Sequence, residues 1–286
     1  MRLEGIGRRY GPRGPWVLRE VGLDLPAGTL ARVTGGNGTG KSTLLRLLAG
    51  VDAPSAGRIT GRPPRTAYVP ERFPAALPLT ATGYLVHLGR VQGLTGREAA
   101  ARAGEWLARF DAAPYADTPL AELSKGTSQK VAVAQALLAD PDLLVLDEAW
   151  TGLDTTARTE LDHAVRARVA AGARVVFVDH DPRRLAGEAD AEYRVVEGGV
   201  YGGVYGGPDR TEPGAVPGAR VRVSASGGTP LPSGLPGAPA YAPAGPDDAR
   251  PTVTVTVDAA HSDTLLRALL DAGWHIDELA TEGVRT

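Results

Sequence analysis

The chain has 286 residues and a mass of 29.7 kDa, enough for one full α/β domain and a small additional domain. Hydrophobic residues make up 43% and charged residues 22%, a composition that argues against disorder of the whole chain. A net charge of −2 gives no electrostatic basis for binding nucleic acid, and the absence of cysteine excludes disulfides, thiolate zinc sites and cysteine nucleophiles.

Apolar runs alternate with helical patterns along residues 1–206. Strands are predicted at Trp16–Leu25, Leu30–Thr34, Ala67–Val69, Leu143–Leu146, Arg174–Val178 and Tyr193–Val196, and helices at Lys41–Ala49, Arg97–Phe110, Thr127–Leu138, Thr156–Ala171 and Pro182–Ala186. The runs at 143–146 and 175–178 are rich in Val and Leu without polar interruption, which suits strands buried on both faces of a parallel sheet. This alternation predicts an α/β fold.

After residue 206 the composition changes. Residues 207–250 are rich in Pro and Gly and are predicted to be a linker, although Ala219–Ser224 alternates like a strand. Residues 251–286 again show strand and helix patterns, which predict a small β–α appendage. Its strand is Val253–Val257, and its helix starts at Ser262 or Asp263, ends at Gly273 and carries Leu265, Leu266, Leu269 and Leu270 on one face.

Residues 35–43 fit the phosphate-loop pattern G-x-x-x-x-G-K-[ST] between a predicted strand and a predicted helix. The pattern comprises Gly35, Gly36, Asn37, Gly38, Thr39, Gly40, Lys41, Ser42 and Thr43. Glycines let successive backbone N–H groups point at phosphate oxygens, Lys41 would reach the β- and γ-phosphates, and Ser42 would hold Mg²⁺. The alternative is a glycine-rich turn without a ligand, and the loop alone does not separate kinases, GTPases and ATPases.

Two further apolar strands end in side chains that suit hydrolysis. Asp147 and Glu148 follow the run at 143–146, so Asp147 is a candidate Mg²⁺ ligand through water and Glu148 a candidate acceptor for a proton of the attacking water. His180 follows the next buried strand and is expected at the same sheet edge. The alternative for the Asp-Glu pair is an acidic loop after a core strand.

Between these motifs, Leu123-Ser-Lys-Gly-Thr precedes a helical pattern. Ser124 can cap that helix, so a hydroxyl, the N–H of Gly126 and the helix dipole would converge on one point that suits an anion. A simple cap without a ligand is the local alternative.

The order of these motifs, with Thr151-Gly-Leu-Asp154 before His180, resembles the ATP-binding subunit of ABC (ATP-binding cassette) transporters over residues 1–206. The resemblance implies a P-loop NTPase core with a mostly parallel sheet, an antiparallel β subdomain, a helical subdomain at about 76–138, and ATP with Mg²⁺ as cofactors. It also implies a head-to-tail pair of ATPase subunits, identical or different.

The resemblance assigns roles to individual residues. Glu148 would be the catalytic base and His180 the switch histidine, Ser124 and Gly126 would contact ATP bound to the partner subunit, Asp154 would lie at the dimer seam, and Tyr10 would stack on adenine. A plain turn tyrosine is the alternative for Tyr10.

Three of the motifs depart from the family pattern. Lys125 and Thr127 replace a glycine and a glutamine of the signature, and Ala149-Trp150 replaces Pro-Thr after Glu148. Glu71 stands where the family has the Q-loop glutamine, and it is a candidate Mg²⁺ ligand whose charge would lie beside the phosphates.

The sequence therefore predicts an ATP-hydrolysing subunit that drives a separate transmembrane permease from the cytoplasmic side of the membrane. Residues 72–95, with Leu77, Leu79, Leu85 and Leu88, would form part of a docking groove for that permease or, alternatively, a core helix face. Lys125 in the signature and the C-terminal appendage resemble features of exporters, so export is favoured over import. The competing functional classes are a soluble ABC ATPase acting on ribosomes or DNA, a P-loop kinase or GTPase, and a nucleotide-binding module without turnover.

Overall fold

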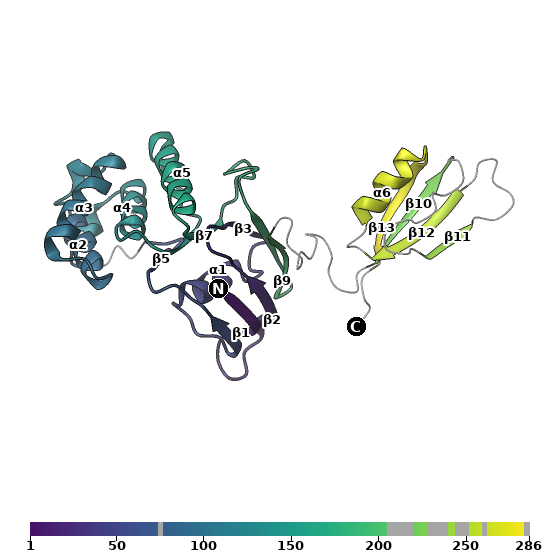
Figure 1. Cartoon of the computed structure of the whole chain (residues 1–286), viewed down its shortest axis with the longest axis horizontal. Coiled ribbons are helices and arrows are strands. Elements are labelled where there is room, and N and C mark those ends of the chain that lie inside the picture. The colour runs from purple at the N-terminus through teal and green to yellow at the C-terminus, as the bar shows by residue number, and fades with distance from the viewer. Residues whose placement is uncertain (74–76, 205–219, 228–239, 244–251, 259–261, 283–286) are drawn as a thin grey trace. The chain divides into compact units, whose positions relative to one another are not determined.

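The computed structural model describes residues 1–73, 77–204, 220–227, 240–243, 252–258 and 262–282. By its contacts the chain divides into two compact units, Met1–Arg210 and Thr211–Thr286, which are drawn in Figure 1. Each unit has its own hydrophobic core.

A six-stranded sheet forms the centre of the first unit. Its order is β5 (Thr66–Val69), β6 (Leu143–Asp147), β7 (Arg174–Val178), β3 (Leu30–Gly35), β8 (Ala191–Val196) and β9 (Gly199–Val204). Every neighbouring pair is parallel except β8 and β9. All five residues of β6 are buried, as its continuous apolar run predicts, and the α/β expectation is confirmed.

A second, antiparallel sheet of the same unit has the order β2 (Trp16–Asp24), β1 (Arg2–Arg9), β4 (Ala56–Thr60). Helix α1 (Lys41–Ala49) buries Leu44, Leu45, Leu47 and Leu48 in a core that it shares with both sheets. The helix that leaves the phosphate loop is thus fixed by apolar contacts on several sides.

Four longer helices complete the first unit: α2 (Ala81–Val91), α3 (Gly96–Arg109), α4 (Lys125–Leu137) and α5 (Thr155–Ala170). Helices α2, α3 and α4 gather on one side, in blue to teal in Figure 1, and the short 3₁₀ turns η1 (Ala113–Tyr115) and η2 (Leu120–Glu122) join α3 to α4. In the segment that allowed two interpretations, Leu85 is fully buried and Leu79 and Leu88 pack against the core, which favours the core helix face there. Leu77 is 41% exposed.

The prediction of a helix at Pro182–Ala186 is wrong. Residues 182–188 form hydrogen-bonded turns, because Leu185 has a φ of 48° and Gly187 a φ of 77°, both outside the helical region. The side chain of Arg32 also takes main-chain carbonyls of this segment as acceptors, including those of Asp181 and Pro182.

The second unit is a four-stranded antiparallel sheet with one helix among its described residues. Its order is β11 (Ala240–Pro243), β12 (Thr252–Asp258), β10 (Arg220–Ser226), β13 (His275–Glu282), and α6 spans Ser262–Asp271. Part of the stretch expected to be a linker therefore forms strands, since Val221, Val223 and Ala225 alternate into a buried face; the rest of 207–250 lies outside the described residues.

The helix predicted in the appendage forms with a narrower apolar face than expected. Leu265 and Leu269 are fully buried and Leu266 packs against the same core, whereas Leu270 is 56% exposed. Within the described residues, no helix is both long and apolar enough to cross a membrane.

Candidate active site

Four neighbouring parallel strands bring the predicted site residues to one edge of the main sheet. The phosphate loop follows β3, His180 follows β7, Asp147 and Glu148 end β6, and Glu71 follows β5. Because the carboxyl ends of parallel strands meet at the same edge, segments that are far apart in the chain come together there.

The phosphate loop has the backbone that its glycines permit. Gly35 has a φ of 144°, and Gly40 has a φ of 109° and caps α1 in the left-handed region. A Cβ atom on Gly35 would lie 2.5 Å from the carbonyl oxygen of Val195. Only glycine fits this position, so the spacing of the motif reflects space as well as backbone torsion.

The side chain of Lys41 folds back over the phosphate loop. Its Nζ donates to the carbonyl oxygens of Gly35 and Gly36, at 3.0 and 2.8 Å, and Thr39 Oγ1 donates to Gly36 at 2.9 Å. Asn37 and Gly38 are exposed at the tip of the loop. The ammonium group is thus held beside the backbone where phosphate oxygens are expected.

Asp147 is a buried carboxylate with two hydroxyl partners. The Tyr68 hydroxyl donates to it at 3.2 Å, and the Ser42 hydroxyl also donates to it. Burial raises the pKa of Asp147 above its ordinary value, an effect that these hydrogen bonds oppose and the nearby charges of Glu148 and Glu71 reinforce. The pKa of Tyr68 is also raised, first by burial and then by the charge of Asp147.

The residues expected to hold Mg²⁺ fit that ion. Ser42 and Asp147 are hydrogen-bonded to each other, and Glu71 is close enough to influence the charge of Asp147. Among the described residues, no group of three or more His, Asp and Glu side chains could hold a metal ion. Proteins usually bind Mg²⁺ through one or two carboxylates completed by water and substrate phosphates, and the Asp147 carboxylate and the Ser42 hydroxyl supply oxygen donors of that kind.

Glu148 and His180 are in direct contact. Glu148 Oε1 lies 2.7 Å from His180 Nε2, with 20% of the glutamate and 61% of the histidine side chain exposed. Glu148 has a φ of 54°, and its N–H donates to the carbonyl oxygen of Val178 at 3.1 Å. A left-handed backbone at a non-glycine residue costs free energy, and here it turns the carboxylate toward the strand that precedes His180.

Tyr10 lies beside the first turn of α1. Its hydroxyl is 3.3 Å from both Thr43 Oγ1 and Asp52 Oδ2, and the guanidinium of Arg8 lies 4.7 Å from its ring centre. The ring is 47% exposed. The structure thus places an accessible aromatic ring next to the phosphate-loop helix.

Ser124, Gly126 and Asp154 form a second group. Ser124 Oγ accepts from the N–H of Thr127 at 3.1 Å and caps α4, while a Cβ on Gly126 would lie 3.1 Å from the carbonyl oxygen of Gly152. Within the described residues, no hydrogen bond or ion pair joins this group to residues 35–43. Ser124 and Gly126 thus lie at the start of α4 and Asp154 at the start of α5, on other elements than the phosphate loop.

Two residues that sequence reasoning did not assign support this second group. Lys130 forms an ion pair with Asp154 at 2.7 Å, and the buried Gln129 donates to the carbonyl oxygen of Ala149 at 3.1 Å. Asp154 also caps α5, and the hydrogen bond from Ala157 followed by that from Lys130 lowers its pKa. The scarcity of lysine in the sequence, which occurs only at positions 41, 125 and 130, is the one signal that pointed to Lys130.

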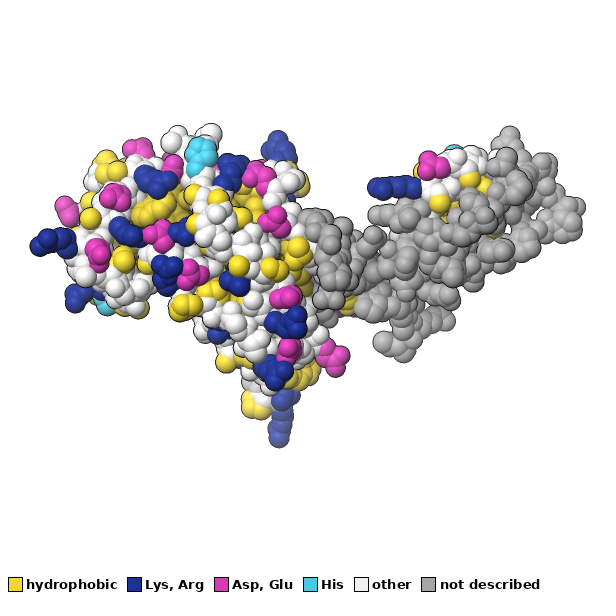
Figure 2. Space-filling model, viewed as in Figure 1, with side chains coloured by type: hydrophobic (Ala, Val, Ile, Leu, Met, Phe, Trp, Pro, Cys, Tyr) yellow, Lys and Arg dark blue, Asp and Glu magenta, His cyan; other side chains and the backbone are white. Residues whose placement is uncertain are grey.

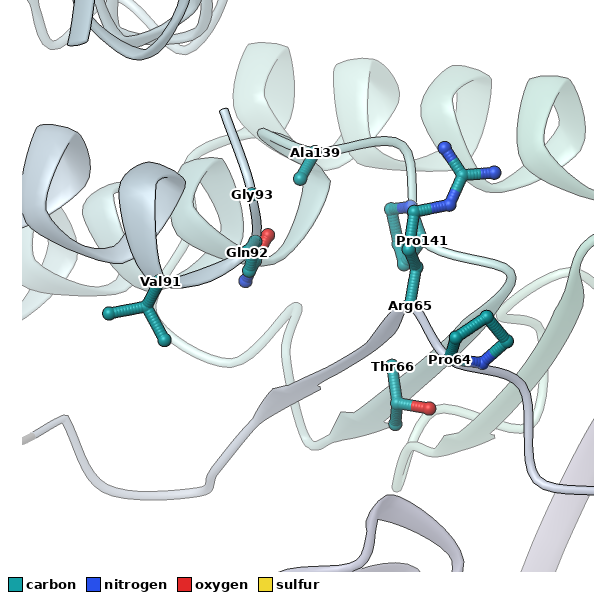
Figure 3. A pocket seen from close by; sticks show the side chains of 8 residues that line it. All are labelled: Pro64, Arg65, Thr66, Val91, Gln92, Gly93, Ala139 and Pro141. Carbon is teal, nitrogen blue, oxygen red and sulfur yellow. The ribbon is translucent and has the colours of Figure 1, made fainter. Parts of the chain in front are cut away.

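A cavity of about 390 Å³ lies away from these residues (Figure 3). Its wall joins the start of β5, the end of α2 and the segment before β6, through residues that include Arg65, Val91, Gln92 and Pro141. Arg65 is already paired with Asp142 at 2.7 Å. None of the predicted site residues lines this cavity.

Charged side chains of both signs are mixed on the face of the first unit that Figure 2 shows. No continuous basic stripe is visible there, in keeping with the near-neutral net charge.

Comparison with known proteins gives consistent matches for the first unit. A family model described as ABC transporter matches residues 18–151. The zinc import ATP-binding protein ZnuC of Cereibacter sphaeroides is 38% identical over 178 residues, which is 61% of this chain and 70% of the relative. The aliphatic sulfonates import ATP-binding protein SsuB 1 of Mesorhizobium japonicum is 36% identical over 192 residues, which is 65% of this chain and 72% of the relative.

Solved structures agree. The structure of an ATP binding subunit of an ABC transporter has a TM-score of 0.64 and 26% identity, covering 70% of this chain and 87% of that one. A dimeric ATP-binding cassette bound to ADP and Pi has a TM-score of 0.63 at 24% identity, covering 70% of this chain and 95% of that one, and supports the fold alone.

Proposed function

Because the chain belongs to the ATP-binding subunits of ABC transporters, we propose that it binds Mg-ATP at residues 35–43 and hydrolyses it to power a separate membrane subunit. The observation that carries the chemistry is the 2.7 Å contact between Glu148 and His180 at the edge that also holds the phosphate loop. A glycine-rich turn without a ligand would not require these two side chains to meet beside it.

In the proposed reaction Glu148 accepts a proton from the attacking water, while His180 orients Glu148 and faces the γ-phosphate. Lys41 and the loop N–H groups hold the β- and γ-phosphates, which places negative charge where the helix dipole of α1 favours it. Ser42 and Asp147 would hold Mg²⁺, which would neutralise charge at the phosphates when bound. Glu71, whose charge acts on Asp147, would be a further carboxylate ligand.

The second group of residues acts on a second subunit in this proposal. Ser124 and Gly126 at the start of α4 present a hydroxyl and backbone N–H groups to the triphosphate bound by the partner, with Asp154 at the seam. The placement of these residues at the starts of α4 and α5, and not on the loop after β3, supports this arrangement. The partner is either an identical chain or a different ATPase subunit.

The test uses purified full-length protein with Mg-ATP. Lys41→Ala is expected to abolish nucleotide retention, and Glu148→Gln is expected to retain ATP while turnover falls by about 10² or more. The Glu148→Gln protein should also shift from monomer to dimer on ATP addition in size-exclusion chromatography. Glu105→Gln, on an exposed position of α3, is the matched control and should behave as the wild type. Unchanged phosphate release by Glu148→Gln would exclude its role as base.

The direction of transport remains a prediction. The signature lysine and the C-terminal unit favoured export in the sequence, whereas the two relatives named above are import proteins for zinc and for sulfonates. Reconstitution with the membrane subunit in vesicles, with ATP supplied on the side of the ATPase, would decide between them by the side on which the substrate accumulates. In either case the proposed location is the cytoplasmic face of the membrane, reached through the permease.

A further inference from the structure

The loop that carries His180 is held by a half-buried arginine of the central sheet. Arg32, on β3, donates through both terminal nitrogens to main-chain carbonyls on either side of the histidine's turn. The acceptors are Asp179, Asp181, Pro182 and Arg184, the shortest bonds being 2.8 Å to Asp181 and 2.9 Å to Pro182. This loop is therefore fixed along its length from the side of the sheet.

The same loop is also held by Asp162, in the middle of α5. The Arg184 guanidinium donates to both oxygens of Asp162, at 3.0 and 3.3 Å. The indole N–H of Trp150 donates to Asp162 Oδ1 at 2.8 Å. Trp150 stands two residues after Glu148 and Arg184 four residues after His180, so one carboxylate joins the two segments that carry the reacting pair.

These contacts lie in a region from which water is largely excluded. Trp150 is 2% exposed, and the side chains of Arg184 and Asp162 are 15% and 18% exposed. The Trp150 ring lies between the guanidinium of Arg184, at 5.5 Å, and the ring of Phe177, at 5.7 Å. Because water has little access, a bond lost here is not readily replaced, and the segments would shift instead.

We propose that Asp162 is a positioning residue of the ATPase reaction, which sets the separation of Glu148 and His180 by holding Trp150 and Arg184 together. This inference rests on the proposed function. The His180 side chain is 61% exposed, so its position relative to Glu148 depends largely on the backbone segments that bear the two residues. A displacement of about 1 Å at a reacting group costs up to about 10²-fold in rate.

The experiment compares Asp162→Ala with Asp162→Asn in the full-length protein, measuring kcat and KM for ATP. Asp162→Ala is expected to lower kcat by about 10- to 100-fold with KM within about twofold, because phosphate binding does not involve α5. Asp162→Asn keeps an acceptor for Trp150 and is expected to fall between the wild type and Asp162→Ala. Trp150→Phe keeps a buried ring without the indole N–H, and it should lower kcat in the same sense if Asp162→Ala does not fold.

The control is the Arg166–Glu188 pair, which also joins α5 to the segment after His180, with contacts of 2.7 and 2.8 Å. Neither residue is hydrogen-bonded to Trp150, so Arg166→Gln should leave kcat within about twofold. Equal losses in Arg166→Gln and Asp162→Ala would overturn the proposal in favour of simple attachment of the loop to the helix. Wild-type kcat in both Asp162→Ala and Trp150→Phe would also overturn it, whereas absence of turnover in the wild type would overturn the proposed function itself.

Discussion

Asp147 has a carboxylate that the fold buries beside two other carboxylates. Burial raises its pKa although Ser42 and Tyr68 donate to it, and Glu148 and Glu71 place further negative charge nearby. The ionised form of Asp147 is therefore less favourable in the folded protein than in the unfolded chain. Such a residue weakens the protein alone and gains a favourable partner when a divalent ion arrives.

We therefore expect Asp147→Asn to raise the melting temperature of nucleotide-free protein at pH 7 by about 2–4 °C, the shift that about 1 kcal/mol produces in a domain of this size. The raised pKa means that the cost of ionisation is complete above the folded-state pKa and disappears as the pH falls toward the ordinary value of 3.8. The difference in Tm between variant and wild type, measured by calorimetry, should shrink from pH 7 to pH 4. The variant should also lose the stabilisation that Mg-ATP gives the wild type; a lower Tm at pH 7 would contradict this account.

At the residue scale, the sequence identified side chains better than it identified their partners. Lys41, Asp147, Glu148 and His180 were predicted from spacing and flanking strands, because those patterns describe local chain geometry. Tyr68 is 79 positions away from its partner Asp147, and no local pattern relates the two. Trp150, which stands where the family has threonine, fills the core and donates to Asp162, and the distant Asp162 is again a partner that no local pattern indicates.

At the scale of elements, α4 combines a structural and a proposed functional role at its first turn. Ser124 caps the helix through the N–H of Thr127, and the same hydroxyl is proposed to face the triphosphate of the partner subunit. An exposed Lys125 follows at the first helical position, where the helix dipole disfavours a cation. A cap and a phosphate contact make different demands on the side chain, so substitutions can separate them.

Ser124→Ala should lower the melting temperature by about 2–4 °C, since loss of an N-cap costs about 1 kcal/mol. Ser124→Asp should keep the wild-type Tm, because aspartate caps as well as serine does, yet lower kcat at least tenfold by placing a negative charge against phosphate. Thermal melts and phosphate release on the same samples test both statements. Wild-type turnover by Ser124→Asp would reduce Ser124 to a cap alone.

The sequence predicts helices and strands correctly where the hydrophobic pattern is regular. It fails where contacts between distant residues determine the local conformation. The strands β6 and β7 follow directly from uninterrupted apolar runs. The helix expected at Pro182–Ala186 does not form, because two left-handed residues and the contacts of Arg32 hold the segment in turns. Strand β10 has clear alternation, but its proline- and glycine-rich surroundings suggested a linker.

At the scale of the whole molecule, both the sequence and the contacts distinguish a large first unit from a small second one. Every predicted site residue lies in Met1–Arg210, together with both cores that position the strand ends. The second unit has a separate core that includes Val223, Val255, Leu265 and Trp274. The first unit can be recognised from its motifs, because phosphate binding requires particular residue types at particular positions. The second unit can be predicted only from its hydrophobic pattern.

This separation leads to a prediction for a chain ended at Arg210. Since every predicted site residue and both cores lie in the first unit, the shortened protein should fold, bind Mg-ATP and hydrolyse it with kcat/KM within about twofold of the full chain. In calorimetry, ATP at about 100 times its Kd stabilises the unit that binds it by about 2.7 kcal/mol, which raises its transition by about 5–10 °C. Full-length protein should show one transition that responds to ATP and one that does not, and only the responsive one should remain after shortening. If the shortened chain binds ATP yet loses turnover, the second unit contributes to subunit pairing or to the closed site, and the separation inferred from the cores does not extend to function.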